Sequence, residues 1–375
     1  MSSILLSETF FGEIDFRNIK TEGIKYIGSK EKIIPYILRM VYKLNPKTIF
    51  DGFSGTTRVS QAFAKLGYKV ISNDIAIWSK TFATCYLLNK KDKKYYEPLI
   101  EYLNNLPPKF GWFSQHYGGD PSKGQNKKPW QIQNTMKLDA IREEIDKIAS
   151  DEIEKDVLLT SLILALDKVD NTIGHFSAYL KDWSARSYRE MKLKVPELII
   201  SNVCHEVYQE DIFKLVPSIV ADLAYYDPPY GSSNDKMPPS RVRYQAYYHI
   251  WTTIIKNDKP KLFGSALRRY DSSDKLAYSP FEDFRKNGSG RFVALEAIEN
   301  LIKETRAEFI VFSYSSNGRV KIKELIDVFS AWSKIIEIQE INYKKNVMSY
   351  MRWTNKWVND DNGKPNIEYL FLLKK

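Results

Sequence analysis

Residues 47–74 show one complete strand, turn, helix and strand pattern, and this pattern constrains the fold more than any other part of the chain. The run 47–50 is typical of a short strand, and residues 51–57, Asp-Gly-Phe-Ser-Gly-Thr-Thr, form a glycine-containing turn. Residues 59–67 have helical spacing and end on glycine, as helices commonly do. A second strand, residues 69–73, stops at Asp74. This order predicts a βαβ unit in an α/β domain.

The acid that closes this unit indicates a nucleotide-type cofactor. A carboxylate at the end of the second strand, here Asp74, is where the ribose hydroxyls of such cofactors usually bind. The turn has no third glycine to make room for a pyrophosphate, and Asp51 at the end of the first strand would repel phosphates. The same negative charge suits the ammonium group of a methionine. These residues favour S-adenosylmethionine over NAD, although Gly55 taken alone would be only a turn glycine.

A second strand ending carries the chemistry. Residues 222–226 are mostly apolar and stop at Asp227, Pro228, Pro229 and Tyr230. Prolines cannot donate to a sheet and hold φ near about −65°, so the strand must end there. Asp227 and a proline carbonyl can both accept hydrogen bonds from one exocyclic NH2 group, while the Tyr230 ring offers a face to the base that carries it. The tetrapeptide predicts methyl transfer to an amino group; taken alone, it could be a simple turn.

Size and composition restrict the class of protein. The chain has 375 residues, enough for one large α/β domain with an insertion or for two domains. No apolar run approaches the roughly 18 residues that span a bilayer, and the N-terminus lacks the pattern of a secretion signal. The two cysteines, Cys85 and Cys204, form no metal motif, and no metal site is predicted. Together these features favour a soluble cytoplasmic protein without membrane association.

The charge of the chain points to a polyanionic partner. The net charge is +10, and basic residues recur in clusters such as 90–94 and 241–243. Lysine-rich loops that only keep the protein soluble are an equally good explanation of the charge alone. The 24 tyrosines and 8 tryptophans tilt the balance slightly toward nucleic acid, because aromatic rings stack on unpaired bases.

In chain order, these motifs resemble the D12 class of DNA adenine-N6 methyltransferases, the family that includes the Dam enzymes, in its α-type permutation. The segments that carry the resemblance are the N-terminal cofactor loop 26–30, the cofactor turn 51–57, the ribose-binding acid at 73–75, the pair that contacts the cofactor adenine at 209–213, and the catalytic motif 227–230. Ser29 and Ser54 stand where this family commonly has glycine, a departure that removes no charged partner.

The resemblance implies a Rossmann-like S-adenosylmethionine-dependent methyltransferase fold with a mixed seven-stranded sheet, in which 309–315 and 368–373 are later strands. It also implies the site residues. The catalytic residues would be Asp227, Pro228, Pro229 and Tyr230, and the cofactor-binding residues Tyr26, Lys30, Asp51, Phe53, Gly55, Thr56, Asp74, Ile75, Asp211 and Ile212.

The long segment between Asp74 and Asp211 must carry structure of its own. We therefore expect a catalytic domain made of residues 1–85 and 200–375, and a mostly helical target-recognition region at 86–199. Within that region, helices are predicted at 136–149 and 153–168, and the loops 111–117 and 171–177 carry amides, hydroxyls and aromatics that can read base edges. After the catalytic motif, residues 238–251 are expected to turn helical and close over the target base.

The function implied by the resemblance is site-specific methylation of adenine N6 in double-stranded DNA, with the adenine flipped out of the duplex. The enzyme would be the modification component of a restriction–modification system, with any cognate endonuclease on a separate polypeptide, and a monomer is favoured. Two alternatives stay open. One is an amino methyltransferase that acts on RNA, on cytosine N4 or on a protein amide; the other is a nucleic-acid-binding module without activity.

Overall fold

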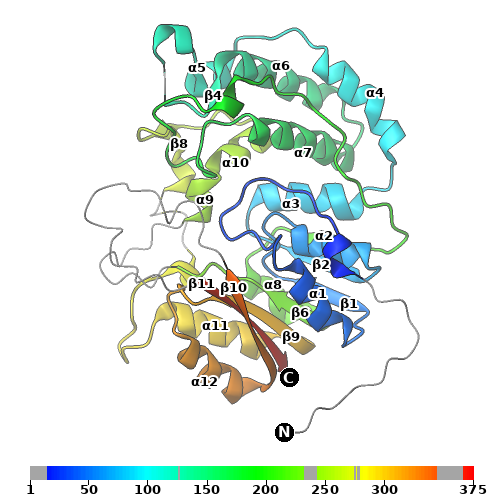
Figure 1. Ribbon diagram of the computed structural model, residues 1–375, viewed down its shortest axis with the longest axis vertical. Coiled ribbons are helices and arrows are strands. Elements are labelled where there is room, and N and C mark those ends of the chain that lie inside the picture. The colour runs from blue at the N-terminus through cyan, green and yellow to red at the C-terminus, as the bar shows by residue number, and fades with distance from the viewer. Residues whose placement is uncertain (1–14, 126, 232–242, 274–275, 277–278, 344–365) are drawn as a thin grey trace.

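The computed structural model describes residues 15–125, 127–231, 243–273, 276, 279–343 and 366–375. Its centre is a seven-stranded sheet with the order β10-β11-β9-β6-β1-β2-β5 (Figure 1). The strands are β1 (Thr48–Asp51), β2 (Lys69–Asn73), β5 (Glu206–Tyr208), β6 (Val220–Tyr226), β9 (Arg306–Ser315), β10 (Lys334–Tyr343) and β11 (Asn366–Lys374). Five strands pair in parallel and β11 runs antiparallel between β9 and β10, so the predicted mixed seven-stranded α/β fold is confirmed.

The parallel pairing brings the ends of three central strands together. Asp51, the last residue of β1, pairs with Ser72 of β2 on one side and with Tyr225 of β6 on the other. Asp74 comes two residues after Ser72, and Asp227 comes two residues after Tyr225. The three acids therefore gather at one edge of the sheet, where α/β proteins bind their ligands.

The two faces of the sheet enter separate cores, because successive side chains of a strand point in opposite directions. In β6, Leu223 and Tyr225 pack on one face while Ala224 and Tyr226 pack on the other. The first face is covered by α1 (Ile34–Tyr42), α2 (Arg58–Lys65) and α3 (Ile77–Ala83), and the second by α8 (Ile212–Leu215), α11 (Val293–Glu304) and α12 (Ile322–Trp332).

A helical region lies beyond α3, at the top of Figure 1. It contains α4 (Lys93–Asn104), α5 (Trp112–Tyr117), α6 (Ile132–Ile148) and α7 (Glu152–Lys168), of which α6 and α7 are the two helices predicted at 136–149 and 153–168. It also contains α9 (Tyr244–Tyr247) and α10 (His249–Lys256), which come from beyond the catalytic motif. The buried Arg142 of α6 donates hydrogen bonds to the carbonyls of Ile254 and Ile255 and so ties α10 to this region. Residues 238–242 of the segment expected to close over a base lie outside the described residues.

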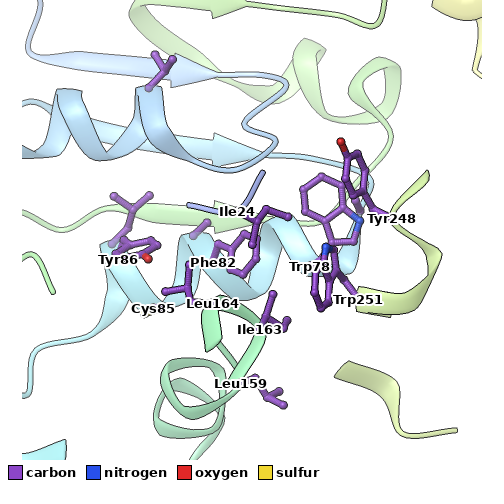
Figure 2. Close-up of a cluster of buried hydrophobic side chains, with 14 of the residues drawn as sticks. Ile24, Trp78, Phe82, Cys85, Tyr86, Leu159, Ile163, Leu164, Tyr248 and Trp251 are labelled. Carbon is purple, nitrogen blue, oxygen red and sulfur yellow. The ribbon is translucent and has the colours of Figure 1, made fainter. Parts of the chain in front are cut away.

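Buried aromatic and aliphatic side chains join the helical region to the sheet (Figure 2). Trp78 of α3 lies beside Tyr248, and Trp251 of α10 packs edge-on against Phe176 with 4.7 Å between ring centroids. Ile163 of α7 belongs to the same cluster. One apolar core thus continues from the sheet into the helical region. Within the described parts of the chain, no helix combines the length and apolarity needed to cross a membrane.

Candidate active site

One pocket opens at the sheet edge where Asp51, Asp74 and Asp227 gather. Every residue that the sequence predicted for the site lines this pocket: Tyr26, Lys30, Asp51, Phe53, Gly55, Thr56, Asp74, Ile75, Asp211, Ile212, Asp227, Pro228, Pro229 and Tyr230. They come from the loop before α1, the ends of β1, β2 and β6, and the start of α8. The fold therefore assembles in one place residues that are up to two hundred positions apart in the chain.

The turn after β1 is shaped by two glycines. A Cβ atom on Gly52 would lie 2.6 Å from the ring of Tyr226, so a larger residue cannot occupy this position without a shift of that buried ring. Gly55 has a φ of +49°, in the left-handed region that glycine adopts most readily. Its amide donates a hydrogen bond of 2.9 Å to Oδ2 of Asp74. The turn is thereby fastened to the acid that ends the second strand.

Asp51 is fully buried at the floor of the pocket. Its Oδ2 accepts a hydrogen bond of 2.6 Å from Ser60, whereas no donor in the described parts of the chain forms a hydrogen bond of ordinary geometry with Oδ1. Burial raises the pKa of this carboxyl to about 7, with the Ser60 hydrogen bond opposing the rise. The backbone amide of Phe53 lies near this carboxyl and also lowers its pKa. A buried acceptor without a well-formed hydrogen bond can take a donor from a ligand, and a cationic ammonium group would suit it.

The part of the pocket near the end of β2 and the start of α8 combines acids with apolar side chains. Asp74 accepts hydrogen bonds from the amides of Gly55 and Ala76, each at 2.9 Å, and burial raises its pKa. Ile75, although hydrophobic, is 52% exposed beside it. Asp211 caps α8 by accepting from the amide of Phe213 at 2.8 Å. An adenosine placed here would find carboxylates for its hydroxyls and apolar surface for its base.

Lys30 and Tyr230 contact the Asp227 carboxylate directly. The Lys30 ammonium lies 2.9 Å from Oδ1 of Asp227 and 3.1 Å from Oε1 of Glu368, and it donates a hydrogen bond of 2.7 Å to the Tyr230 hydroxyl. That hydroxyl is in hydrogen-bond contact with both carboxylates. The resemblance places Lys30 among the cofactor-binding residues; in the structure it lines the pocket, and its charged end lies beside Asp227 and Glu368.

The charged groups in this cluster shift one another's pKa values. Burial raises the pKa of Asp227 to about 6, with the Lys30 ammonium opposing the rise and the Glu368 carboxylate adding to it. Burial by itself would lower the pKa of Lys30, but the two carboxylates outweigh it and raise that pKa above its usual value. Lys30 therefore stays protonated, and Asp227 loses its proton near neutral pH.

Sequence reasoning missed three residues of the site. Glu368 was seen only as part of a closing strand, and Tyr244 and Tyr248 only as part of a helical segment. The rings of Tyr26, Tyr244 and Tyr248 form one cluster, in which the Tyr26 centroid lies 5.2 Å from Tyr244 and 4.8 Å from Tyr248, and the last two lie 6.4 Å apart. The signal that could have identified Glu368 is a single acid within the otherwise apolar run 367–373 of β11.

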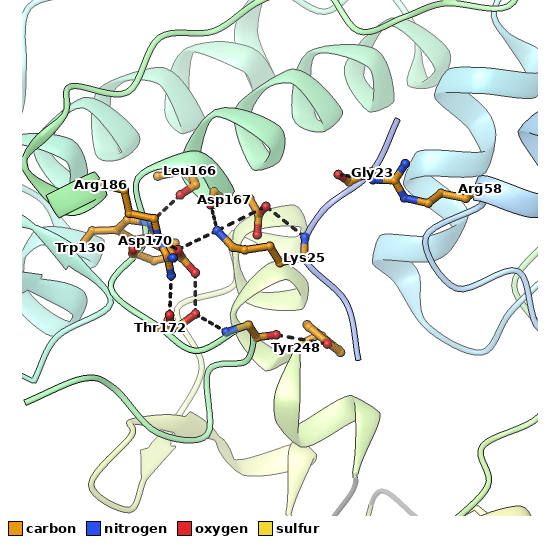
Figure 3. Close-up of polar contacts among 11 residues, drawn as sticks. Gly23, Lys25, Arg58, Trp130, Leu166, Asp167, Asp170, Thr172, Arg186 and Tyr248 are labelled. Atoms are coloured by element: carbon orange, nitrogen blue, oxygen red, sulfur yellow. Dashed lines mark hydrogen bonds and ion pairs between the residues drawn. The ribbon is translucent and has the colours of Figure 1, made fainter. Parts of the chain in front are cut away.

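A polar network holds the N-terminal loop of the pocket against the helical region (Figure 3). Lys25 forms an ion pair of 2.8 Å with the buried Asp170, and its amide donates to Oδ2 of Asp167 at 3.0 Å. Arg186 donates to Asp170 at 2.9 Å. Nearby, the Tyr248 hydroxyl accepts from the amide of Ile27 at 2.8 Å. The loop of residues 170–186 is thus fixed relative to the pocket.

Comparison with known proteins agrees with this geometry. The chain matches the family described as D12 class N6 adenine-specific DNA methyltransferase over residues 26–328. It is 28% identical over 342 residues to Modification methylase StsI of Streptococcus sanguinis. That alignment covers 86% of this chain and 48% of StsI. It is 27% identical over 364 residues to Type II methyltransferase M.NlaIII of Neisseria lactamica, with 94% of this chain and 99% of that protein covered.

The relatives differ in length. Type II methyltransferase M2.HphI of Haemophilus parahaemolyticus is 28% identical over 387 residues and is matched over 99% of its length, with 95% of this chain covered. By contrast, the chain spans about half the length of StsI, at 48%, and of Modification methylase LlaI of Lactococcus lactis subsp. lactis, at 51%. The family match includes the helical region, the residues that line the pocket and strands β1, β2, β5, β6 and β9, and it ends before β10 and β11.

Proposed function

The chain belongs to the D12 class of N6 adenine-specific DNA methyltransferases, and from this premise we propose that it transfers a methyl group from S-adenosylmethionine to N6 of a flipped adenine in double-stranded DNA. The observation that carries the proposal is the position of Asp227, Pro228, Pro229 and Tyr230 at the rim of a pocket that also holds Asp51 and Asp74. In such a pocket an amine acceptor lies beside a cofactor site.

The pocket residues fit S-adenosylmethionine. We assign the methionine ammonium to the buried Oδ1 of Asp51, the ribose hydroxyls to Asp74, and the adenine to the apolar surface of Ile75 and Ile212, with Asp211 beside it. When bound, this cofactor supplies an activated methyl group on a sulfonium, so the enzyme does not need to generate a strong nucleophile. The protein's task is to orient the amine and to exclude water.

The proposed roles at the amine follow from hydrogen-bonding capacity. The Asp227 carboxylate and the Pro228 carbonyl accept the two N–H groups of the adenine amine, which directs its lone pair away from the ring. The Tyr230 ring stacks on the base. With the cofactor bound, the amine held in this way would be placed to accept the methyl group, and the sulfur would keep the electron pair of the bond that breaks. The methylated nitrogen releases a proton to Asp227 and from there to water, so no strong general base is required.

We further propose that residues 86–199 act as the target-recognition region, with residues 1–85 and 200–375 as the catalytic domain. The support is geometric: the network of Lys25, Asp170 and Arg186 fixes the loop 170–186 beside the pocket, and Tyr188 next to it is 58% exposed. An exposed ring close to a flipped base can stack on the bases left behind. In the structure α9 and α10 lie with this region, so they belong to the same proposed surface.

The biological role is proposed from the relatives. The names of these relatives, modification methylase and type II methyltransferase, suggest a modification component. We propose that it works with a separate restriction endonuclease and acts on DNA in the cytoplasm as a monomer. The net charge of +10 favours a polyanionic substrate of this kind.

A competition assay tests the substrate class. The protein is incubated with labelled S-adenosylmethionine and equal amounts of unmethylated duplex DNA, ribosomal RNA and protein. We expect label in DNA alone. Label confined to RNA or protein would be consistent with methyl transfer to an amine at Asp227, but it would contradict DNA as the substrate.

Asp51 gives a test of the cofactor site. Replacing Asp51 by asparagine keeps an acceptor for Ser60 but removes the charge, and we expect the Kd for S-adenosylmethionine to rise about tenfold, the equivalent of about 1.4 kcal/mol. Because the pKa of the free carboxyl is about 7, the affinity of the unchanged protein should increase from pH 5.5 to pH 7.5, as Asp51 ionises. Calorimetric titration across that range measures both effects.

The control for this test is Ser60→Ala, which removes a hydrogen bond to Asp51 and leaves its charge. This variant should keep a pH-dependent cofactor affinity, with the rise moved to higher pH because the hydrogen bond that lowers the pKa of Asp51 is lost, whereas Asp51→Asn should lose the dependence. An Asp51→Asn protein that binds the cofactor as tightly as the unchanged protein, with the same pH dependence, would show that the ammonium lies elsewhere.

A further inference from the structure

Lys30 has two carboxylate partners, and only one of them belongs to the catalytic motif. Its ammonium lies 2.9 Å from Asp227 and 3.1 Å from Glu368, a residue of β11 that is 138 positions from Tyr230 in the chain. Glu368 is 6% exposed. Its Oε1 accepts hydrogen bonds from Ser313 at 2.7 Å and from Tyr230 at 2.5 Å. A strand residue does not need to be a buried acid with three polar contacts, so the position of Glu368 beside Asp227 points to a role in the site.

The position of Glu368 follows from the antiparallel pairing of β11 with β9, which places Glu368 opposite Ser315 and near Ser313. β9 in turn pairs with β6, whose end carries Asp227. Glu368 therefore stands on a rigid central strand of the sheet and cannot leave the site without disturbing that pairing. Lys30, by contrast, reaches the site on a long flexible side chain from a loop.

The charges in the cluster add to an excess of one negative charge. Asp227 and Glu368 contribute two carboxylates, and Lys30 contributes one ammonium. The other titratable groups that interact electrostatically with Asp227 include Tyr26 from the N-terminal loop, Asp51 from β1, Tyr225 and Tyr230 from β6 and the turn after it, and Tyr244 from α9. Without Glu368, the charges of Lys30 and Asp227 would cancel. The carboxylate proposed to accept the amine would then carry no net negative charge together with its partner.

We propose that Glu368 is a positioning residue of the methyl-transfer site: as the counter-ion of Lys30, it leaves the Asp227 carboxylate with a net negative charge directed at the target amine. The inference rests on the proposed function. Positive charge develops on the amine nitrogen as the methyl group arrives, and a net negative charge fixed beside it stabilises that state more than the uncharged amine of the ground state. Glu368 acts through Lys30 and needs no contact with the substrate.

The variant Glu368→Gln tests the inference, because it keeps an oxygen for Ser313 and Tyr230 and removes the charge. We expect kcat to fall by roughly 100-fold, as when a fixed electrostatic contact to a transition state is removed, with KM for DNA and cofactor within about threefold. Glu368 raises the pKa of Asp227, so its loss should move the acid limb of the kcat profile to lower pH. Lys30→Gln should move that limb to higher pH.

A double variant separates charge from packing. Lys30→Gln combined with Glu368→Gln restores one net negative charge on Asp227, so its kcat should exceed that of Glu368→Gln alone. Glu368→Asp keeps the charge at a shorter reach and should retain more activity than Glu368→Gln, which covers the case in which the glutamine variant folds poorly. The control is Glu340→Gln, an exposed acid of the neighbouring strand β10, which should leave kcat and its pH profile unchanged.

The outcomes distinguish this inference from the proposed function. If the unchanged protein does not methylate adenine in DNA, the proposed function fails. If it does, and Glu368→Gln keeps the same kcat and acid limb, the inference is overturned. It is also overturned if Glu368→Gln lowers the unfolding temperature and kcat without moving the acid limb, and the double variant recovers nothing, because Glu368 would then be only structural.

Discussion

An Asp227→Ala protein is expected to bind S-adenosylmethionine with a Kd within about tenfold of the unchanged value and to transfer no measurable methyl group to DNA. In the proposed mechanism the carboxylate is the acceptor that orients the amine, and in the structure its Oδ1 also contacts Lys30 and Tyr230. Its removal takes away the orienting hydrogen bond and leaves Lys30 beside Glu368 alone. The cofactor contacts proposed for Asp51 and Asp74 lie on other strands and remain.

Asp222→Ala is the matched control, since it removes a carboxylate from the other end of the same strand. That side chain accepts from the amides of Lys47 and Thr48 at 2.7 and 2.8 Å, so its loss should lower stability slightly and leave turnover intact. Single-turnover methyl transfer and calorimetric cofactor binding, measured on both variants, check the prediction. Near-normal turnover by Asp227→Ala would remove the catalytic assignment.

Trp251→Ala should produce the largest loss of stability. Trp251 is fully buried on α10, 4.7 Å from Phe176 and 5.9 Å from Trp130 between ring centroids. Truncating a buried tryptophan removes its apolar contacts and leaves a cavity, at a cost of about 3–5 kcal/mol. Because α10 follows Tyr248, which packs on Tyr26 in the pocket, we also expect methyl transfer to be lost at a lower temperature.

Urea unfolding followed by tryptophan fluorescence and circular dichroism measures this effect. Trp332→Ala is the control: that ring is 40% exposed on α12, where its indole N–H donates to Glu299, and its loss should cost well under half as much. Equal unfolding midpoints for the two variants would contradict the view that α10 fastens the helical region to the sheet.

Local patterns were sufficient to predict the centre of the fold. The βαβ unit at 47–74 was readable because its strands, turn and helix are contiguous, and each is set by spacing and by glycine. The end of β6 was readable because Pro228 and Pro229 stop a strand wherever they occur. These segments hold nearly half of the residues that line the pocket, and the sheet brings them together as expected.

The remaining parts depend on contacts between distant segments. Nothing in the run around Glu368 indicates that it faces Lys30, because this contact depends on the antiparallel register of β11 with β9. The packing of the Tyr26 ring against Tyr244 and Tyr248 likewise joins residues more than two hundred positions apart. Such contacts are set by the packing of whole elements, which spacing within one element does not reveal.

The measurement that tests the central claim most directly is transfer of labelled methyl groups from S-adenosylmethionine to unmethylated duplex DNA, followed by nucleoside analysis and mapping of the modified positions. The account predicts N6-methyladenine as the labelled nucleoside, confined to one short sequence motif. Label on cytosine, or no label in DNA under conditions in which the cofactor binds, would contradict it.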